Sequence, residues 1–148
     1  MSADAFVLDA SVLIAAVLPN EPFHPDANAL MRRLTDVGAC LYVPTIAFAE
    51  IAAAIARGAG DEQLALAVVA QYATRADLHQ IGVDVALGVL ATETAARQRI
   101  RGCDAVYVAL AHTEQAILVT LDGQQRERAP AGVTVRTPAQ ALAECSQP

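Results

Sequence analysis

Lysine and tryptophan are both missing from this 148-residue chain, and every basic residue in it is an arginine. A Walker A loop needs a lysine to reach the nucleotide phosphates, so nucleotide hydrolysis by that route is excluded. Phospho-aspartyl switches and aspartate-based phosphatases also use a lysine beside their carboxylates. The missing lysine therefore argues against several kinds of phosphate chemistry.

Positive charge is scarce as well, because 10 arginines face 16 acidic residues and the formal net charge is −6. A protein that coats nucleic acid through its phosphates needs a basic surface, so that role is disfavoured. A nuclease is compatible with this balance, because a site built of carboxylates is itself acidic until a metal ion binds.

The three cysteines, Cys40, Cys103 and Cys145, are odd in number and form no CxxC pair. They indicate free thiols in a reducing cytosol rather than a disulfide framework or a zinc site, so we expect a cytoplasmic protein. No uninterrupted apolar run is long enough to span a membrane. The first residues carry aspartates instead of the basic start of a signal peptide, and we expect no such peptide.

Apolar residues make up 55% of the chain, which is enough for the core of one domain over residues 1–148. Short apolar runs predict strands at residues 5–8, 40–43, 78–83, 116–121 and 133–135. Helical patterns separate them, at residues 12–18, 26–37, 45–57, 61–74, 84–99 and 103–115, with a last helix from Pro138. This alternation predicts an α/β fold in three α/β/α layers, with a mostly parallel sheet of about five strands flanked by helices.

Four acidic residues border otherwise uncharged apolar segments, namely Asp9, Glu50, Asp104 and Asp122. An ionised carboxylate beside core-building residues is costly unless something pairs with it. Asp9 and Asp122 each follow a predicted strand, so both should emerge at the sheet edge where α/β proteins bind ligands. Asp104 opens a helix, whose dipole favours a carboxylate. Glu50 lies inside its helix, beyond any capping position, and has the weakest local explanation.

Each of these acids has an ordinary structural interpretation when it is taken alone. Asp9 and Asp122 suit turns after strands, and Asp104 suits a helix cap. Glu50 precedes Arg57 by two helical turns and can pair with it. Taken as an ordered set, the four favour a site for a hard divalent cation, because Mg²⁺ prefers oxygen ligands. The three isolated histidines offer no competing zinc site.

Three segments of the chain carry a family resemblance: VLDASVLI, RGCDAVYVALA and LVTLD. Together with the glutamate inside an apolar helix, they resemble the PIN-domain ribonucleases, and most closely the VapC-type toxins of bacterial toxin–antitoxin pairs. The resemblance runs from Phe6 to about Pro138. It implies a central parallel sheet and an acidic pocket that binds Mg²⁺ or Mn²⁺. Relatives commonly have a hydrophobic residue near position 125, where this chain reads GQQRER.

The resemblance also implies roles for individual residues. The acidic catalytic set would be Asp9, Glu50, Asp104 and Asp122. Asp9 and Asp104 would contact the metal directly, while Glu50 and Asp122 would act through water or complete its shell. Ser11 and Thr120 match supporting hydroxyl positions, although Ser11 also suits a helix cap and Thr120 an ordinary strand residue.

Arginines border the expected pocket in the sequence and can bind RNA phosphates. Arg97, Arg99 and Arg101 precede Asp104, and Arg126 and Arg128 follow Asp122. Solvated helix ends are the ordinary alternative for such arginines.

We therefore interpret the sequence as a metal-dependent endoribonuclease that hydrolyses RNA with a metal-activated water. The resemblance implies 5′-phosphate and 3′-hydroxyl product ends, a cognate antitoxin as partner, and a homodimer. Two alternatives stay open. One is a PIN-fold protein that binds RNA or a partner without cleavage. The other is a metal-dependent phosphohydrolase of small esters, although no phosphate-binding glycine loop supports it.

Overall fold

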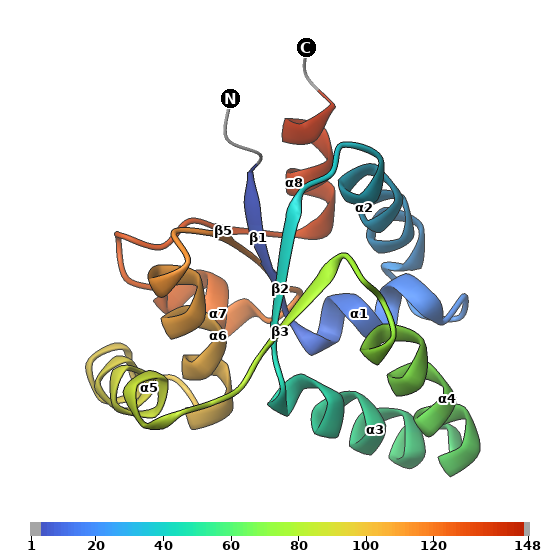
Figure 1. Cartoon of the computed structure of the whole chain (residues 1–148), viewed down its shortest axis with the longest axis horizontal. Helices are drawn as coiled ribbons and strands as arrows, with labels where there is room; N and C mark the ends of the chain where they lie inside the picture. The colour runs from blue at the N-terminus through green and yellow to red at the C-terminus, as the bar shows by residue number, and fades with distance from the viewer. Residues whose placement is uncertain (1–3, 147–148) are drawn as a thin grey trace.

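A parallel sheet runs through the middle of the computed structural model, which describes residues 4–146 (Figure 1). Its strands are β1 (Ala5–Leu8), β2 (Cys40–Pro44), β3 (Leu78–Ile81), β4 (Ile117–Val119) and β5 (Val135–Arg136). They lie in the order β3-β2-β1-β4-β5, and all four pairings are parallel. The expected α/β fold with a parallel five-stranded sheet is confirmed.

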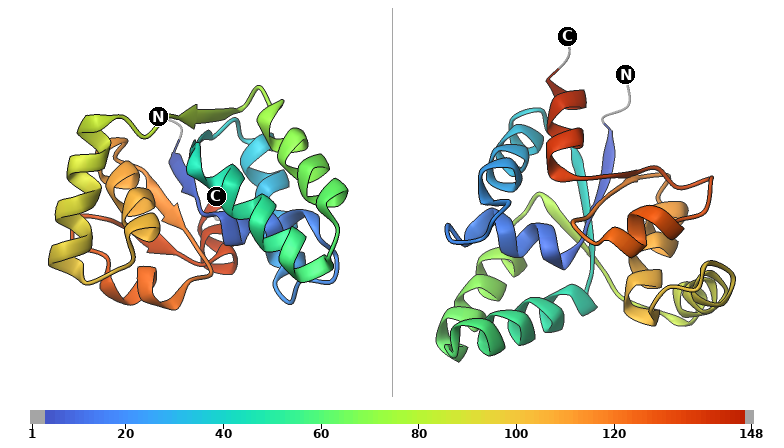
Figure 2. Two further views of the ribbon diagram at one scale, coloured as in Figure 1. Left: turned by 90° about the horizontal axis from the view of Figure 1, so that it is seen from below. Right: turned by 180° about the vertical axis from the view of Figure 1, so that it is seen from behind.

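Helices cover both faces of this sheet, as Figures 1 and 2 show. They are α1 (Ala10–Val17), α2 (His24–Asp36), α3 (Ile46–Ala59), α4 (Glu62–Ala73), α5 (Val85–Gln98), α6 (Gly102–Thr113), α7 (Gly123–Arg128) and α8 (Pro138–Cys145). Helices α1 to α4 and α8 pack together on one face, and α5 to α7 on the other. Within residues 4–146, no helix has both the length and the apolar character needed to cross a membrane.

Helix α6 is the most deeply buried helix near the site, because its sequence is apolar on every side. It is buried from Asp104 to Ala111 and packs between the sheet and α5. The only charged residue in that buried stretch is Asp104, in the first turn. The packing of α6 therefore carries a carboxylate into the interior beside the sheet edge.

The centre of that edge lies where β1 and β4 end. Asp9 follows β1 directly and continues its pairing, since its backbone N donates to the Val119 carbonyl at 3.0 Å. Strand β4 is shorter than expected and β5 begins two residues later than expected. The chain leaving β4 therefore reaches Asp122 in an irregular segment beside Asp9.

Two details of the helices differ from the sequence expectation. Ser11 does not cap the first helix, because that helix begins at Ala10 and Asp9 holds the cap position. Residues 123–128 form α7, which the sequence did not predict because GQQRER has no apolar periodicity. The Asp122 side chain caps α7 by accepting a hydrogen bond from the Gln125 backbone N at 2.9 Å.

Candidate active site

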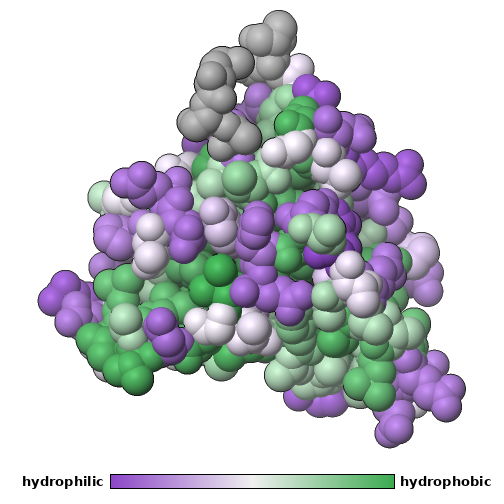
Figure 3. Space-filling model, in the orientation of Figure 1, coloured by the Kyte–Doolittle hydropathy of each residue, from purple (hydrophilic) through white to green (hydrophobic). Residues whose placement is uncertain are grey.

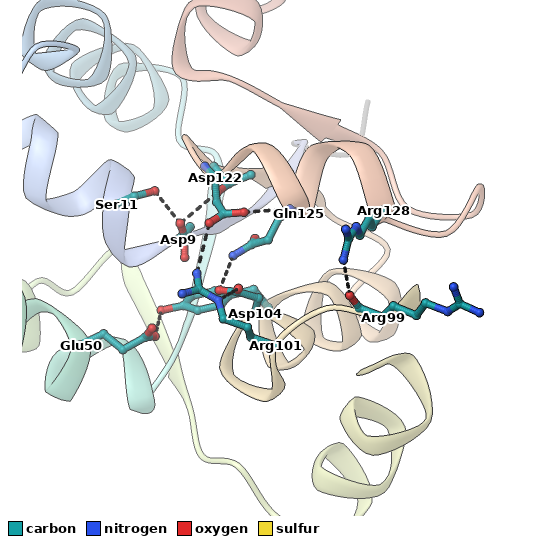
Figure 4. Close-up of polar contacts among 11 residues, drawn as sticks. Asp9, Ser11, Glu50, Arg99, Arg101, Asp104, Asp122, Gln125 and Arg128 are labelled. Atoms are coloured by element: carbon teal, nitrogen blue, oxygen red, sulfur yellow. Dashed lines mark hydrogen bonds and ion pairs between the residues drawn. The ribbon is translucent and has the colours of Figure 1, made fainter. Parts of the chain in front are cut away.

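A cleft of about 620 Å³ opens at the carboxyl edge of the sheet, and all four acidic residues line it. Asp9 comes from the end of β1, Glu50 from α3, Asp104 from the first turn of α6, and Asp122 from the start of α7. Figure 4 shows their carboxylates facing a common space. The fold thus brings together four acids that are spread over 114 positions of the sequence, from 9 to 122.

Asp9 is buried, with 5% of its surface exposed, and two hydroxyls hold one of its oxygens. Its Oδ2 accepts hydrogen bonds from the Ser11 Oγ and, at 2.9 Å, from the Thr120 Oγ1. Burial raises the pKa of Asp9, the bonds from Ser11 and Thr120 lower it, and the charge of Asp104 raises it again. The net result is a raised pKa, so the ionised form of Asp9 is held at a cost.

The same two hydroxyls tie Asp9 to the chain that leads to Asp122. Thr120 is fully buried, and its Oγ1 accepts a hydrogen bond from the Asp122 backbone N at 2.9 Å. The Ser11 Oγ accepts one from the Leu121 backbone N at 3.2 Å. Each hydroxyl therefore donates a hydrogen bond to Asp9 and accepts one from a backbone N–H group. Together these bonds fix the spacing between Asp9 and Asp122.

Arg101 bridges the other two aspartates. Its Nε donates to the Asp104 Oδ2 at 2.8 Å and its Nη2 to the Asp122 Oδ2 at 3.3 Å. Asp104 has only 6% of its surface exposed, whereas the Arg101 side chain is 72% exposed. An exposed guanidinium is weakly held. Arg101 can therefore leave the carboxylates when another cation or a substrate phosphate competes.

Glu50 is half-buried, and its Oε1 accepts a hydrogen bond from the Tyr107 hydroxyl at 2.6 Å. Burial raises the pKa of Glu50, the Tyr107 bond lowers it, and the charges of Asp9 and Asp104 raise it. Among the described residues Glu50 makes no ion pair with Arg57, although both line the cleft. The glutamate with the weakest local explanation thus faces the other acids.

The model of the PIN domain family matches residues 6–130. The chain belongs to the PIN domain family. No match was found among curated proteins. Among solved structures, the fold is similar to VapBC2 from Rickettsia felis bound to a promoter DNA fragment, with 14% identity, a TM-score of 0.70, and 90% of this chain and 98% of that one covered.

Two other similar structures come from other organisms. PAE2754 from Pyrobaculum aerophilum is 17% identical with a TM-score of 0.71, over 97% of this chain and 90% of that one. VapC20 from Mycobacterium tuberculosis, described as a sarcin–ricin loop cleaving toxin, is 17% identical with a TM-score of 0.70, over 86% and 98%. At these identities the likeness shows that the PIN domain fold is shared.

The arginines of this PIN domain divide between the cleft and the outer surface. Arg101 lines the cleft, and so does Arg57, which the sequence had suggested only as a partner for Glu50. Arg97 pairs with Glu93 at 3.7 Å on the exposed face of α5. Arg99 ends α5 with a φ of 54°, its carbonyl accepts a bond from Arg128, and its side chain points away from the acids in Figure 4.

Two residues of the PIN domain site were missed as polar participants at the sequence level. Tyr107 lies one turn after Asp104, so the spacing alone places it on the same side of α6. Gln125 is fully buried where a hydrophobic residue was expected, and its Nε2 donates to the Asp104 Oδ1 at 3.0 Å. No signal in the sequence marked Gln125, because GQQRER has no apolar periodicity.

The donors of this PIN domain fit a hard divalent cation. The four acidic side chains of the cleft offer carboxylate oxygens as ligands. Mg²⁺ is commonly bound by one or two carboxylates while it keeps several waters. The charge of Asp104 raises the pKa of Asp9, and a bound cation would relieve that repulsion. Within residues 4–146, no three His, Cys, Asp or Glu side chains group as a ready metal site. Two carboxylates completed by water therefore fit better than an all-protein cage.

Proposed function

We propose that this chain is a metal-dependent endoribonuclease and the toxin of a toxin–antitoxin pair. The observation that carries the proposal is the convergence of Asp9, Glu50, Asp104 and Asp122 on one cleft. Membership of the PIN domain family supports it, and so does the likeness to a VapC toxin that cleaves the sarcin–ricin loop.

In this proposal Asp9 and Asp104 would hold Mg²⁺ or Mn²⁺, which would supply a water acidified toward neutral pH and a Lewis acid for the phosphoryl oxygens. The water oxygen bonds to phosphorus while the bond from phosphorus to the 3′ oxygen breaks. The departing 3′ oxygen takes up a proton. The products are a 5′-phosphate and a 3′-hydroxyl.

Glu50 accepts the proton of the attacking water. Its raised pKa makes it a better base near neutral pH than an ordinary glutamate, because a general base works best when its pKa approaches the working pH. The Tyr107 hydroxyl fixes Oε1 and leaves Oε2 for the water. Asp122 orients water from the other side of the cleft, with its own carboxylate held by the α7 cap and by Arg101.

Substrate contacts come from the two arginines of the cleft. Arg101 and Arg57 both line it, and each can pair with a phosphate through parallel N–H groups. On RNA binding, Arg101 exchanges its carboxylate partners for phosphate. Arg97 and Arg99 were expected to share this role from the sequence, but their placement outside the cleft leaves Arg101 as the favoured member of the three.

An antitoxin partner is supported by the surface beside the cleft. An apolar groove of about 950 Å³ includes Leu18, Phe23 and Leu64, and it shares Ser11 and Leu121 with the acidic cleft. A bound segment could fill the groove with apolar side chains and place a basic one among the acids. A similar fold occurs in a toxin–antitoxin complex from Klebsiella pneumoniae, at 18% identity and a TM-score of 0.62 over 93% of this chain and 98% of that one.

A homodimer is supported by a second apolar surface. Val85 is 85% exposed and Val89 55% exposed, both on α5. Figure 3 shows green apolar surface gathered at the lower left, where Figure 1 places α5. Burial of exposed valines against a second copy would remove this apolar area from water.

The test is cleavage of a structured RNA in Mg²⁺ or Mn²⁺ by the wild type and by Asp9→Asn. We expect metal-dependent cleavage by the wild type, loss of cleavage in Asp9→Asn, and no turnover of a chromogenic phosphate monoester. Turnover of the monoester without RNA cleavage would instead indicate a phosphohydrolase of small esters.

One observation favours the alternative of a PIN domain that binds RNA or a partner without cutting. Arg101 already neutralises Asp104 and Asp122, as a structural ion pair would. Titration with Mn²⁺ in a calorimeter separates the two functions. If the wild type binds Mn²⁺ and Arg101→Gln binds it more tightly, the nuclease is supported. If neither protein binds Mn²⁺, the non-cleaving protein is supported.

A further inference from the structure

Gln125 is a polar residue at the buried position of α7, where a hydrophobic side chain would be the ordinary choice. It is the third residue of α7, its side chain is completely buried, and the residues on either side of it are exposed. The polar run from 123 to 128 thus places one amide inside the protein. That placement needs an explanation, since buried amides are costly unless they are fully hydrogen-bonded.

Half of the Gln125 amide is not satisfied. Its Nε2 donates to the Asp104 Oδ1 at 3.0 Å, but its Oε1 is buried without a hydrogen-bond partner among residues 4–146. A buried acceptor without a donor destabilises a protein by about 1–3 kcal/mol. A methionine of the same length would avoid that cost. The hydrogen bond that the Gln125 Nε2 donates must therefore have a role that offsets the cost of the unpaired Oε1.

The N–H side of the Gln125 amide faces Asp104, which is one of the two candidate metal ligands. Figure 4 shows the Gln125 side chain reaching from α7 to Asp104. An ionised carboxylate only accepts hydrogen bonds, so the N–H donor at Asp104 offsets part of the repulsion between Asp104 and Asp9.

We propose that Gln125 is a positioning residue that holds the Asp104 carboxylate, beside Asp9, in the orientation needed to bind the divalent cation. The inference rests on the proposed function, because it concerns the same metal site. Gln125 reaches the site twice: its backbone N binds the cap oxygen of Asp122 at 2.9 Å, and its side chain binds Asp104. A single residue therefore couples the start of α7 to the first turn of α6.

The role predicts a specific effect on metal affinity. Residues that orient metal ligands through hydrogen bonds typically change metal affinity by about 10–100-fold when they are replaced. Gln125→Met keeps the length of the side chain and removes both the N–H donor and the unsatisfied oxygen. We expect Gln125→Met to weaken Mn²⁺ binding at least about tenfold.

The experiment is calorimetric titration of Mn²⁺ into the full chain, below the melting temperature of each variant. Gln124→Met is the matched control, since Gln124 is the exposed neighbour and receives the same substitution. The control should bind Mn²⁺ like the wild type. In RNA cleavage, Gln125→Met should need more Mn²⁺ than the wild type for its half-maximal rate, whereas Gln124→Met should need the same concentration.

The possible outcomes are distinct. If the wild type binds Mn²⁺ and Gln125→Met binds it equally well, Gln125 only fills space and the inference is wrong. If the wild type itself binds no Mn²⁺, the proposed metal-dependent function fails, and the inference fails with it. If Gln125→Met does not fold, Gln125→Asn replaces it. That variant keeps the amide but shortens its reach by one methylene, and it should weaken Mn²⁺ binding in the same direction.

Discussion

Asp9→Asn should make the metal-free protein more stable while it abolishes metal binding. Asp9 is 5% exposed, and its pKa is raised because burial outweighs the hydrogen bonds from Ser11 and Thr120. A raised carboxylate pKa means that folding disfavours the ionised form. Asparagine has nearly the same shape, carries no charge, and keeps an oxygen that can accept both hydroxyl bonds.

The size of the effect follows from the linkage between pKa and stability. Each pKa unit of difference between the folded and unfolded states corresponds to about 1.4 kcal/mol. A change of about 1 kcal/mol shifts the melting temperature of a chain of this length by about 2–4 °C. At pH 7 without metal, we therefore expect Asp9→Asn to melt above the wild type, by about 2–4 °C for each kcal/mol that ionised Asp9 costs the fold.

The gain should depend on pH in a defined direction. Because the pKa of Asp9 is higher in the folded state, proton binding to Asp9 favours folding of the wild type. This contribution is complete when the pH is below the unfolded-state pKa of about 3.9. That contribution is lost as the pH rises through the higher folded-state pKa. Asparagine does not titrate, so its advantage should be largest at neutral pH and should shrink as the wild type becomes protonated in acid.

Mn²⁺ should reverse the order of the two proteins. A ligand at one hundred times its Kd stabilises the folded state by about 2.7 kcal/mol, which only the wild type would gain. The assay is thermal melting from pH 4 to 8, with EDTA or with Mn²⁺. A lower melting temperature for Asp9→Asn in EDTA at pH 7 would refute the argument that burial dominates at Asp9.

Three further predictions concern the surroundings of the acids. Tyr107→Phe removes the hydrogen bond that lowers the pKa of Glu50, so the acidic limb of the cleavage pH profile should move to higher pH. The free energy of unfolding should change by about 1 kcal/mol or less. An unmoved limb would argue against Glu50 as the base. Arg101→Gln should tighten Mn²⁺ binding and flatten the salt dependence of RNA binding, whereas Arg97→Gln, the control outside the cleft, should change neither. Asp77→Asn should cost less than about 1 kcal/mol at pH 7, a loss that disappears as the pH falls through the lowered pKa of Asp77, and RNA cleavage should be unaffected.

The strand pattern was predictable because its physical signal is local. Continuous apolar runs such as Phe6–Leu8 predict strands buried on both faces, and their alternation with helices predicts a parallel sheet. The ends of β4 and β5 were not predictable, since the apolar Ala116 and Leu121 lie outside β4 and the charged Arg136 lies inside β5. Helix α7 was also missed, because a helix of six polar residues depends on the Asp122 cap and on one buried side chain.

The grouping of the four acids in one cleft was predictable for a related reason: a charge inside an apolar segment stands out in the sequence. The groups that act on those acids do not stand out. Gln125 looks like a surface glutamine until α7 turns it inward, and Tyr107 looks like a core residue until its hydroxyl reaches Glu50. The placement of Arg101 in the cleft, and of Arg97 and Arg99 outside it, depends on how the turn between α5 and α6 runs.

The most direct test of the account is to identify the ends of the RNA fragments that the wild-type protein makes in Mn²⁺. Hydrolysis by a water that Glu50 deprotonates predicts 5′-phosphate and 3′-hydroxyl ends. The same fragments should be absent with EDTA and with Asp9→Asn. Fragments that end in a 2′,3′-cyclic phosphate would show attack by the RNA's own 2′-hydroxyl, and they would contradict the account.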